Sequence, residues 1–160
     1  AGPLREKLES LKKYDIVFLK NQNSRADEIK EIIKKQNPLI KIFQMTLNPK
    51  NIQNFDLRQK YLIFSGIGNP KNFKNILLSN NFDIVKEIIF PDHYDYQKDD
   101  IDKIRSEAKK LNASIVTTEK DFVKINKIDN KKINFLEMNL EFDKEVELVD
   151  FIKTRLNEKN

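Results

Sequence analysis

The segment at residues 90–94, FPDHY, contains the only histidine of the chain. Histidine is the side chain whose ordinary pKa lies nearest neutrality, so His93 is the first candidate for proton transfer or for contact with a phosphate group. It follows a predicted strand, and Asp92 and Tyr94 are both near enough in sequence to orient its imidazole. A lone histidine is nevertheless more often a packed or surface residue than a catalyst.

A second unusual segment, FSGIGNP at 64–70, follows the predicted strand 61–64. It resembles the glycine turn of dinucleotide-binding proteins but lacks the third glycine of that pattern. Two interpretations stay open. In the first, the turn is purely structural and needs a glycine with a positive φ angle. In the second, Gly66, Gly68 and Asn69 lie beside a ligand at the C-terminal edge of a sheet.

The third segment, TTEKD at 117–121, also ends a predicted strand. The hydroxyl of Thr118 and the amine of Lys120 could hold phosphate oxygens, with Glu119 or Asp121 pairing with Lys120. The alternative is a helix N-cap made by Thr118, followed by an acidic first turn. Because parallel strands bring their carboxyl ends to one edge, the three segments together predict a ligand site there.

Near the start of the chain, the segment 2–6 (GPLRE) places Arg5 in the first turn of a predicted helix. Arginine suits bidentate contact with phosphate. The alternative is a salt bridge at the helix start with Glu6 or Glu9. The chain begins without an initiator methionine or a signal-peptide pattern, and we expect it to be the C-terminal part of a longer protein.

The composition excludes several classes of site. The 160 residues include no cysteine and one histidine, which excludes disulfides and thiolate metal sites and disfavours zinc. The net charge of +5 comes mostly from lysines scattered among acidic residues, typical of solvated helix faces. No arginine-rich stripe with interleaved aromatics occurs, so no nucleic-acid partner is predicted. No apolar run reaches the length of a membrane span, and no G-x-x-x-x-G-K-[ST] loop is present.

Strands and helices alternate along the sequence. The predicted strands are 15–19, 39–47, 61–64, 84–90, 114–117 and 133–140. The predicted helices are 4–14, 24–36 with Ser24 as cap, one that begins at Pro70 after the cap Asn69, one opened by Asp99 or Asp100 and ending near 111, 120–125 and 143–156. This alternation predicts an α/β layered fold with a mainly parallel sheet flanked by helices.

The polar, asparagine-rich segment 48–59 marks a predicted boundary. We therefore divide the chain into residues 1–38, a linker at 39–59 with β character, and a smaller α/β domain at 60–160.

Taken in order, the segments GPLRE (2–6), FSGIGNP (64–70), FPDHY (90–94) and TTEKD (117–121) resemble the tetraacyldisaccharide 4'-kinase family of lipid A synthesis. The following FVK (122–124) fits the same signature. The resemblance covers essentially the whole chain and corresponds to the C-terminal half of such an enzyme.

The resemblance implies a P-loop N-terminal domain, of which residues 1–38 would be the C-terminal remnant, joined by a short β-ribbon to a smaller α/β domain. It implies transfer of the γ-phosphate of ATP, with Mg²⁺, to the 4'-hydroxyl of tetraacyldisaccharide 1-phosphate, forming lipid IVA. ATP and Mg²⁺ would be bound mainly by the N-terminal half. The enzyme would be peripheral on the cytoplasmic face of the bacterial inner membrane.

Carried over residue by residue, the resemblance makes His93 the catalytic candidate, because it matches the family's histidine that reaches into the active site. Arg5 matches an arginine near the phosphates. The predicted substrate- or phosphate-binding residues are Arg5, Gly66, Gly68, Asn69, Thr118 and Lys120, and no metal ligand is predicted.

Two other classes of function stay open from the residues alone. One is a non-enzymatic α/β module that binds an anionic lipid headgroup or a partner protein through its lysine-rich surface. The other is a regulatory domain that binds a nucleotide at the turn of Gly66 and Gly68.

Overall fold

The computed structural model describes residues 6–20, 25–125, 128 and 130–158. Within these residues the elements alternate as the sequence predicts. They are η1 Leu8–Lys13, β1 Ile16–Lys20, α1 Ala26–Gln36, β2 Lys41–Pro49, η2 Ile52–Asn54, β3 Lys60–Ser65, α2 Pro70–Ser79, β4 Asp83–Ile89, α3 Lys98–Leu111, β5 Ala113–Thr118, α4 Glu119–Ile125, β6 Ile133–Leu136, β7 Met138–Phe142 and α5 Glu145–Asn157.

The chain forms two compact units, one made of residues 1–48 and 139–160 and the other of residues 49–138. This division corrects the predicted boundaries, because residues 139–160 do not belong with the domain predicted at 60–160. The predicted linker at 39–59 is also not a separate element. Its first part is β2, and its second part, with η2, belongs to the unit 49–138.

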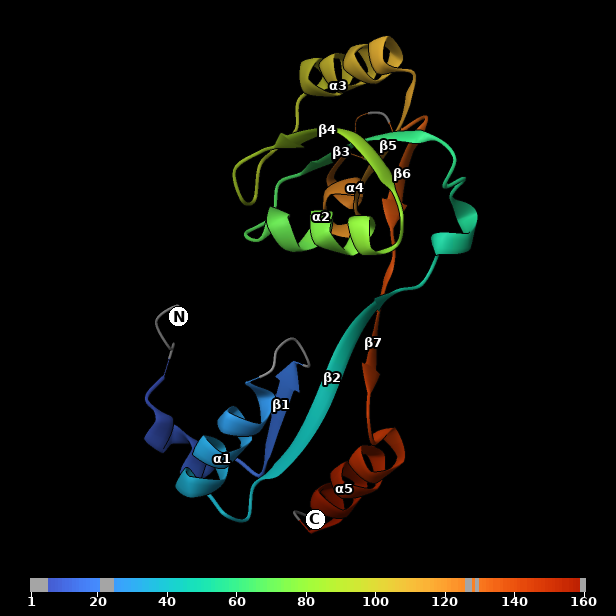
Figure 1. Ribbon diagram of the computed structural model, residues 1–160. Coiled ribbons are helices and arrows are strands. Elements are labelled where there is room, and N and C mark those ends of the chain that lie inside the picture. Colours follow the sequence, from blue (N-terminus) through green and yellow to red (C-terminus); the bar gives the residue numbers. More distant parts are fainter. Residues whose placement is uncertain (1–5, 21–24, 126–127, 129, 159–160) are drawn as a thin grey trace. The chain divides into compact units, whose positions relative to one another are not determined.

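The unit 49–138 contains a four-stranded sheet in the order β4-β3-β5-β6, and each neighbouring pair is parallel. This confirms the mainly parallel sheet. Helix α3 covers one face of the sheet and α2 the other (Figure 1). Because β3 and β5 are the central strands, the loops that follow them open at the middle of the carboxyl edge, between the loops of their neighbours.

Strand β3 shows why this unit has a core on both faces. Its residues alternate between two buried clusters, as the two-residue period of a strand requires. Leu62 and Phe64 pack with Ile101 and Ile104 of α3 in one cluster. Tyr61 and Ile63 belong to the other, which consists of Tyr61, Ile63, Phe73, Leu77, Phe82, Val116 and Leu136. The ring centroids of Tyr61 and Phe82 are 4.8 Å apart.

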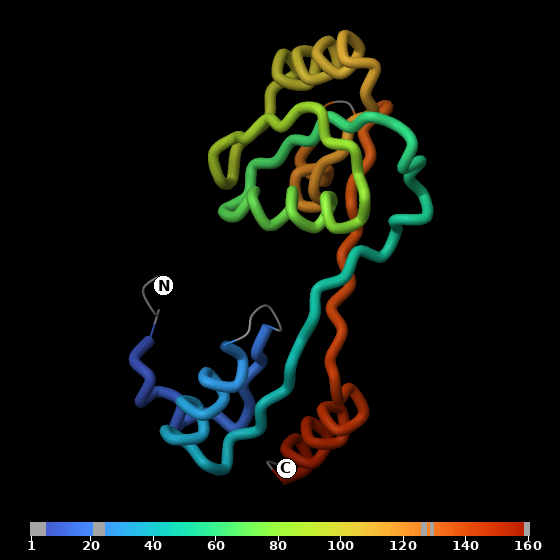
Figure 2. Tube along the Cα trace, viewed as in Figure 1, coloured from blue at the N-terminus to red at the C-terminus, as the bar shows by residue number. Residues whose placement is uncertain are grey.

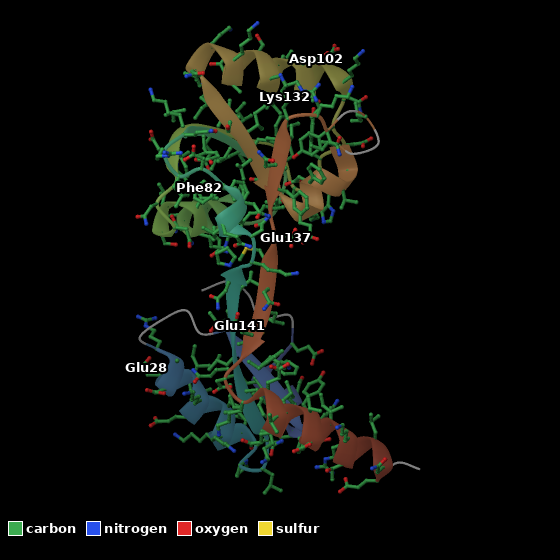
Figure 3. All side chains as sticks on the ribbon, turned by 90° about the vertical axis from the view of Figure 1, so that its right-hand side faces the viewer. Glu28, Phe82, Asp102, Lys132, Glu137 and Glu141 are labelled. Carbon is green, nitrogen blue, oxygen red and sulfur yellow. The ribbon has the colours of Figure 1, made fainter. Side chains whose placement is uncertain are left out.

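The other unit contains a three-stranded sheet in the order β1-β2-β7, in which β1 and β2 are parallel. Strands β2 and β7 lie side by side although they are far apart in the sequence (Figure 2). Glu141 of β7, labelled in Figure 3, accepts a hydrogen bond of 2.8 Å from Nδ2 of Asn48 in β2. Lys41 of β2 pairs with Glu147 of α5 at 3.2 Å.

The predicted strand at 133–140 is wrong as a single element, because it is two strands in two different sheets. The break falls at Glu137. Its N–H donates to Oδ1 of Asn51 at 2.9 Å, and its carbonyl accepts from N of Lys50 at 2.8 Å. The backbone of Glu137 is therefore paired with residues 50 and 51, and the chain changes sheets at this point.

Two smaller differences concern helix starts. The predicted helix at 4–14 is the short 3₁₀ helix η1, within the residues described. Helix α3 begins at Lys98, before the predicted Asp99, because Oδ2 of Asp100 accepts from N of Gln97 and closes the first turn. The predicted cap Ser24 lies outside the described residues.

None of the helices in the described parts of the chain is both long enough and apolar enough to span a bilayer.

Candidate functional site

The three polar strand ends meet at the carboxyl edge of the β4-β3-β5-β6 sheet, as predicted. The turn after β3 reaches the loop after β4 through N of His93, which donates to the carbonyl of Gly66 at 3.2 Å. It reaches the segment after β5 through N of Gly66, which donates to Oδ2 of Asp121 at 3.0 Å. Nζ of Lys120 lies 3.5 Å from Oδ1 of Asp92. Three segments far apart in sequence therefore form one cluster.

His93 is exposed at this edge, with 77% of its side chain accessible. Its φ angle of 62° lies in the left-handed region, which is uncommon for a residue other than glycine. Asp92 holds this conformation, because its Oδ1 accepts from N of His93 at 3.0 Å, and its Oδ2 lies 3.9 Å from Nε2 of the imidazole. The predicted role of Tyr94 is wrong, since its hydroxyl donates to Asp100 at 3.2 Å.

Asp92 lies between the imidazole of His93 and the amine of Lys120 in this cluster. Burial opposes its ionisation, but the charges of His93 and Lys120 and the hydrogen bond from N of His93 outweigh burial and lower the pKa of Asp92. The carboxylate of Asp92 therefore remains ionised at pH values at which an ordinary aspartate is already protonated. The sequence prediction that Lys120 pairs with Glu119 or Asp121 is wrong, because Lys120 lies against Asp92.

Gly66 is required for close approach, and the predicted positive φ angle is wrong at both glycines of the turn. Neither Gly66 nor Gly68 has a positive φ. A Cβ atom on Gly66 would lie 3.0 Å from the hydroxyl of Tyr96 and 3.2 Å from the carbonyl of Pro91. A Cβ on Gly68 would lie 3.1 Å from Oδ2 of Asp92. At Gly66 the β3–α2 turn can therefore touch the loop that carries His93 only without a side chain.

Two predicted binding residues have structural roles as helix caps. Oδ1 of Asn69 accepts from N of Asn72 at 3.1 Å and caps α2, with Pro70 in the first turn. Oγ1 of Thr118 accepts from N of Asp121 at 3.2 Å and begins α4. The same hydroxyl donates to Oδ2 of Asp121 at 2.7 Å, so Thr118 is engaged on both sides.

Three buried or half-buried side chains beneath the edge are not among the residues that the sequence predicts. Asp121 is fully buried, and Tyr96 is 2% exposed although it follows a polar loop. Lys124 lies 3.9 Å from Oδ1 of Asp121 and donates to the carbonyl of Tyr94 at 3.0 Å. The Thr-x-x-Asp spacing at Thr118 is a capping pattern that could have pointed to Asp121.

The remaining predictions concern Arg5 and metal binding. Arg5 lies outside the described residues. Among the residues that the structure describes, no three histidine or acidic side chains are close enough together to hold a metal ion.

The four tyrosines give a test of this geometry, because the structure raises the pKa of each phenol. The charge of Glu6 raises the pKa of Tyr14. Burial is the main cause of the raised pKa of Tyr61 and of Tyr94. The pKa of Tyr96 is raised strongly, first by burial and then by Asp121. At pH of about 10, where a free tyrosine is half ionised, we expect fewer than half of the phenols of the folded chain to be ionised.

A native-state titration followed by phenolate absorbance, repeated in denaturant, measures this shift. The raised pKa values contribute stability that is fully present at pH values below the pKa of a tyrosine in the unfolded chain. This stability is lost as the pH rises through the pKa values of the folded chain. Coincident titration curves in the native and denatured states would contradict the burial of Tyr96.

The same four segments lie within a match to a known family. Residues 1–157 match the family model described as tetraacyldisaccharide-1-P 4'-kinase. The chain belongs to this family. A tetraacyldisaccharide 4'-kinase of Pelagibacter ubique is 43% identical over 160 residues, which are all of this chain and 51% of that protein. One of Rickettsia typhi is 38% identical over 136 residues, 83% of this chain and 40% of that protein. The chain thus spans about half the length of these curated tetraacyldisaccharide 4'-kinases.

A solved member of the tetraacyldisaccharide 4'-kinase family supports the fold. The crystal structure of the "apo" form of LpxK from Aquifex aeolicus in complex with ATP superimposes with a TM-score of 0.51. The match covers 87% of this chain and 51% of that chain, at 19% sequence identity. At this identity the likeness concerns the fold alone.

Proposed function

We propose that this chain is the C-terminal part of a kinase that transfers the γ-phosphate of ATP to the 4'-hydroxyl of tetraacyldisaccharide 1-phosphate, forming lipid IVA. The proposal is supported by family membership and by one observation of the structure. This observation is the convergence of the three family segments at one sheet edge, with His93 and Lys120 exposed and joined through Asp92.

The chemistry of phosphoryl transfer fits such an edge. Transfer depends mostly on positioning and on neutralising the charge of the phosphoryl oxygens. His93 would donate a hydrogen bond to a γ-phosphate oxygen or orient an acidic partner, and Lys120 would add positive charge. Mg²⁺, when bound, would neutralise phosphate charge, and it would be held mainly by residues outside this chain. Closure of the edge over the nucleotide would exclude water and limit hydrolysis of ATP.

The proposed kinase function also implies where the substrates bind and where the protein is located. ATP would be bound mainly by a P-loop domain formed by residues preceding this chain, with residues 1–38 as the last part of that domain. Arg5 would lie near the phosphates. The lipid substrate implies a peripheral position on the cytoplasmic face of the bacterial inner membrane.

The proposal predicts a difference between the isolated chain and the full-length protein. The purified 160-residue chain should show no ATP-dependent transfer, because no P-loop sequence is present in it. The full-length protein should phosphorylate tetraacyldisaccharide 1-phosphate in detergent micelles, measured with radiolabelled ATP. A full-length protein without this activity would contradict the proposal. Turnover by the isolated chain would contradict the proposed need for a P-loop domain that precedes it.

A further inference from the structure

A buried carboxylate beneath the candidate site remains unexplained by its place in α4. Asp121 has no exposed surface. Burial of a carboxylate is costly unless it is paired and hydrogen-bonded, so such a group is retained only where its contacts compensate. A local capping pair would direct this side chain to the backbone N–H of Thr118. Its Oδ2 instead accepts from the hydroxyl of Thr118 at 2.7 Å and from N of Gly66, which follows a different strand, at 3.0 Å.

This bond links Asp121 to the backbone of His93. Gly66 donates its N–H to Asp121 and accepts at its carbonyl from N of His93 at 3.2 Å. Two hydrogen bonds through one glycine therefore connect the buried carboxylate with the residue whose φ angle is left-handed. A hydrogen bond to a charged acceptor is roughly twice as strong as a neutral one, so Asp121 is the stronger of the two anchors of this turn.

The other carboxylate oxygen forms a second link to the same loop. Lys124 lies 3.9 Å from Oδ1 of Asp121, and its Nζ also donates to the carbonyl of Tyr94 at 3.0 Å. Lys124 supplies a compensating charge at Oδ1. The phenol of Tyr96 lies close to the same carboxylate, since its pKa is raised by burial and then by Asp121. Asp121 thus holds the loop of His93 from two sides, through Gly66 and through Lys124.

We propose that Asp121 is a positioning residue, whose buried carboxylate fixes the turn at Gly66 and the loop of His93 in one arrangement, with Lys124 as its counter-charge. The role in catalysis rests on the proposed kinase function. Catalytic groups must be held within a fraction of an ångström by supporting contacts. A carboxylate anchored inside the sheet edge provides such a support without touching the substrate.

The first test measures turnover in the full-length protein. Asp121→Asn keeps the shape of the side chain but removes its charge, and Lys124→Met keeps the stem but removes the counter-charge. We expect each to lower kcat by about 10- to 100-fold, because misplacement of a reacting group acts on the transition state. KM for both substrates should change little. The double variant should lose less than the product of the two single effects, since both act on one link.

The matched control is Ile104→Ala, which truncates a buried side chain of α3 in the apolar core and so lowers stability. Its aliphatic side chain makes no hydrogen bond or ion pair with Asp121, Gly66 or Lys124. Both Ile104→Ala and Asp121→Asn should melt at a lower temperature than the wild type, yet Ile104→Ala should keep its kcat. Equal losses of kcat in Ile104→Ala and Asp121→Asn would overturn the proposal, because they would assign the effect to stability alone.

The second test does not depend on activity. In the 160-residue chain, the amide signals of Gly66 and His93 in a ¹H–¹⁵N spectrum should shift in Asp121→Asn and Lys124→Met and stay in place in Ile104→Ala. The single histidine makes its ring signals unambiguous. If the full-length wild-type protein lacks transfer activity, the kinase function fails and this spectrum alone judges the link. Unshifted signals in Asp121→Asn would overturn the positioning role even in an active enzyme.

Discussion

Replacing His93 by alanine in the full-length protein should lower kcat by about 10²–10³-fold, the usual loss when one donor to developing charge is removed. The side chain of His93 is exposed, and within the described residues the only acidic group that it pairs with is Asp92. Its removal should therefore leave the fold intact. Transfer of labelled phosphate at saturating ATP, together with a melting curve, separates the loss of chemistry from the loss of structure.

The backbone of His93 requires a second variant. Alanine is strained at its φ of 62°, whereas glycine is not. His93→Gly removes the imidazole without this strain, so the two variants should lose the same kcat while His93→Gly is the more stable. Asp95→Asn, an exposed change in the same loop, should keep full activity. A kcat near that of the wild type in His93→Gly would remove His93 from the proposed mechanism.

The second large effect concerns the β3–α2 turn. Gly66→Ala places a methyl group against the hydroxyl of Tyr96, the carbonyl of Pro91 and Cβ of Tyr94, at 3.0 to 3.3 Å. Overpacking of this kind costs about 1–3 kcal/mol. Because the neighbours include backbone, the loop that carries His93 has to move. We expect a lower free energy of unfolding in urea, followed by tyrosine fluorescence, and in the full-length protein a lower kcat.

Gly68→Ala is the matched control for this turn. Its methyl group would meet only the carboxylate end of Asp92, at 3.1 Å, and this flexible carboxylate need shift by only a few tenths of an ångström, which keeps its contacts with His93 and Lys120. Loss of unfolded-state entropy should make this change neutral or stabilising by up to about 1 kcal/mol. The two substitutions thus differ in sign. A destabilisation by Gly68→Ala as large as that by Gly66→Ala would contradict the close packing described for Gly66.

By itself the sequence determined the order of strands and helices, the parallel sheet and the convergence of three polar strand ends. These follow from local patterns, because apolar periodicity, the caps at Asn69 and Thr118, and the alternation of elements act over a few residues. The family segments also made His93 the catalytic candidate before any contact was known, and this role stays a prediction. The break at Glu137 had no such local signal, since it depends on pairing with residues 50 and 51.

Only the tertiary structure decided what the site residues touch. It directed Lys120 to Asp92 and the hydroxyl of Tyr94 to Asp100, and it made Gly66 necessary for contact rather than for a positive φ. It also showed that Asp121 lies buried beneath the turn at Gly66. These contacts join residues far apart in the chain, and their partners are set by how the strands are ordered in the sheet. That order fixes which carboxylate meets which amide, and local sequence spacing does not encode it.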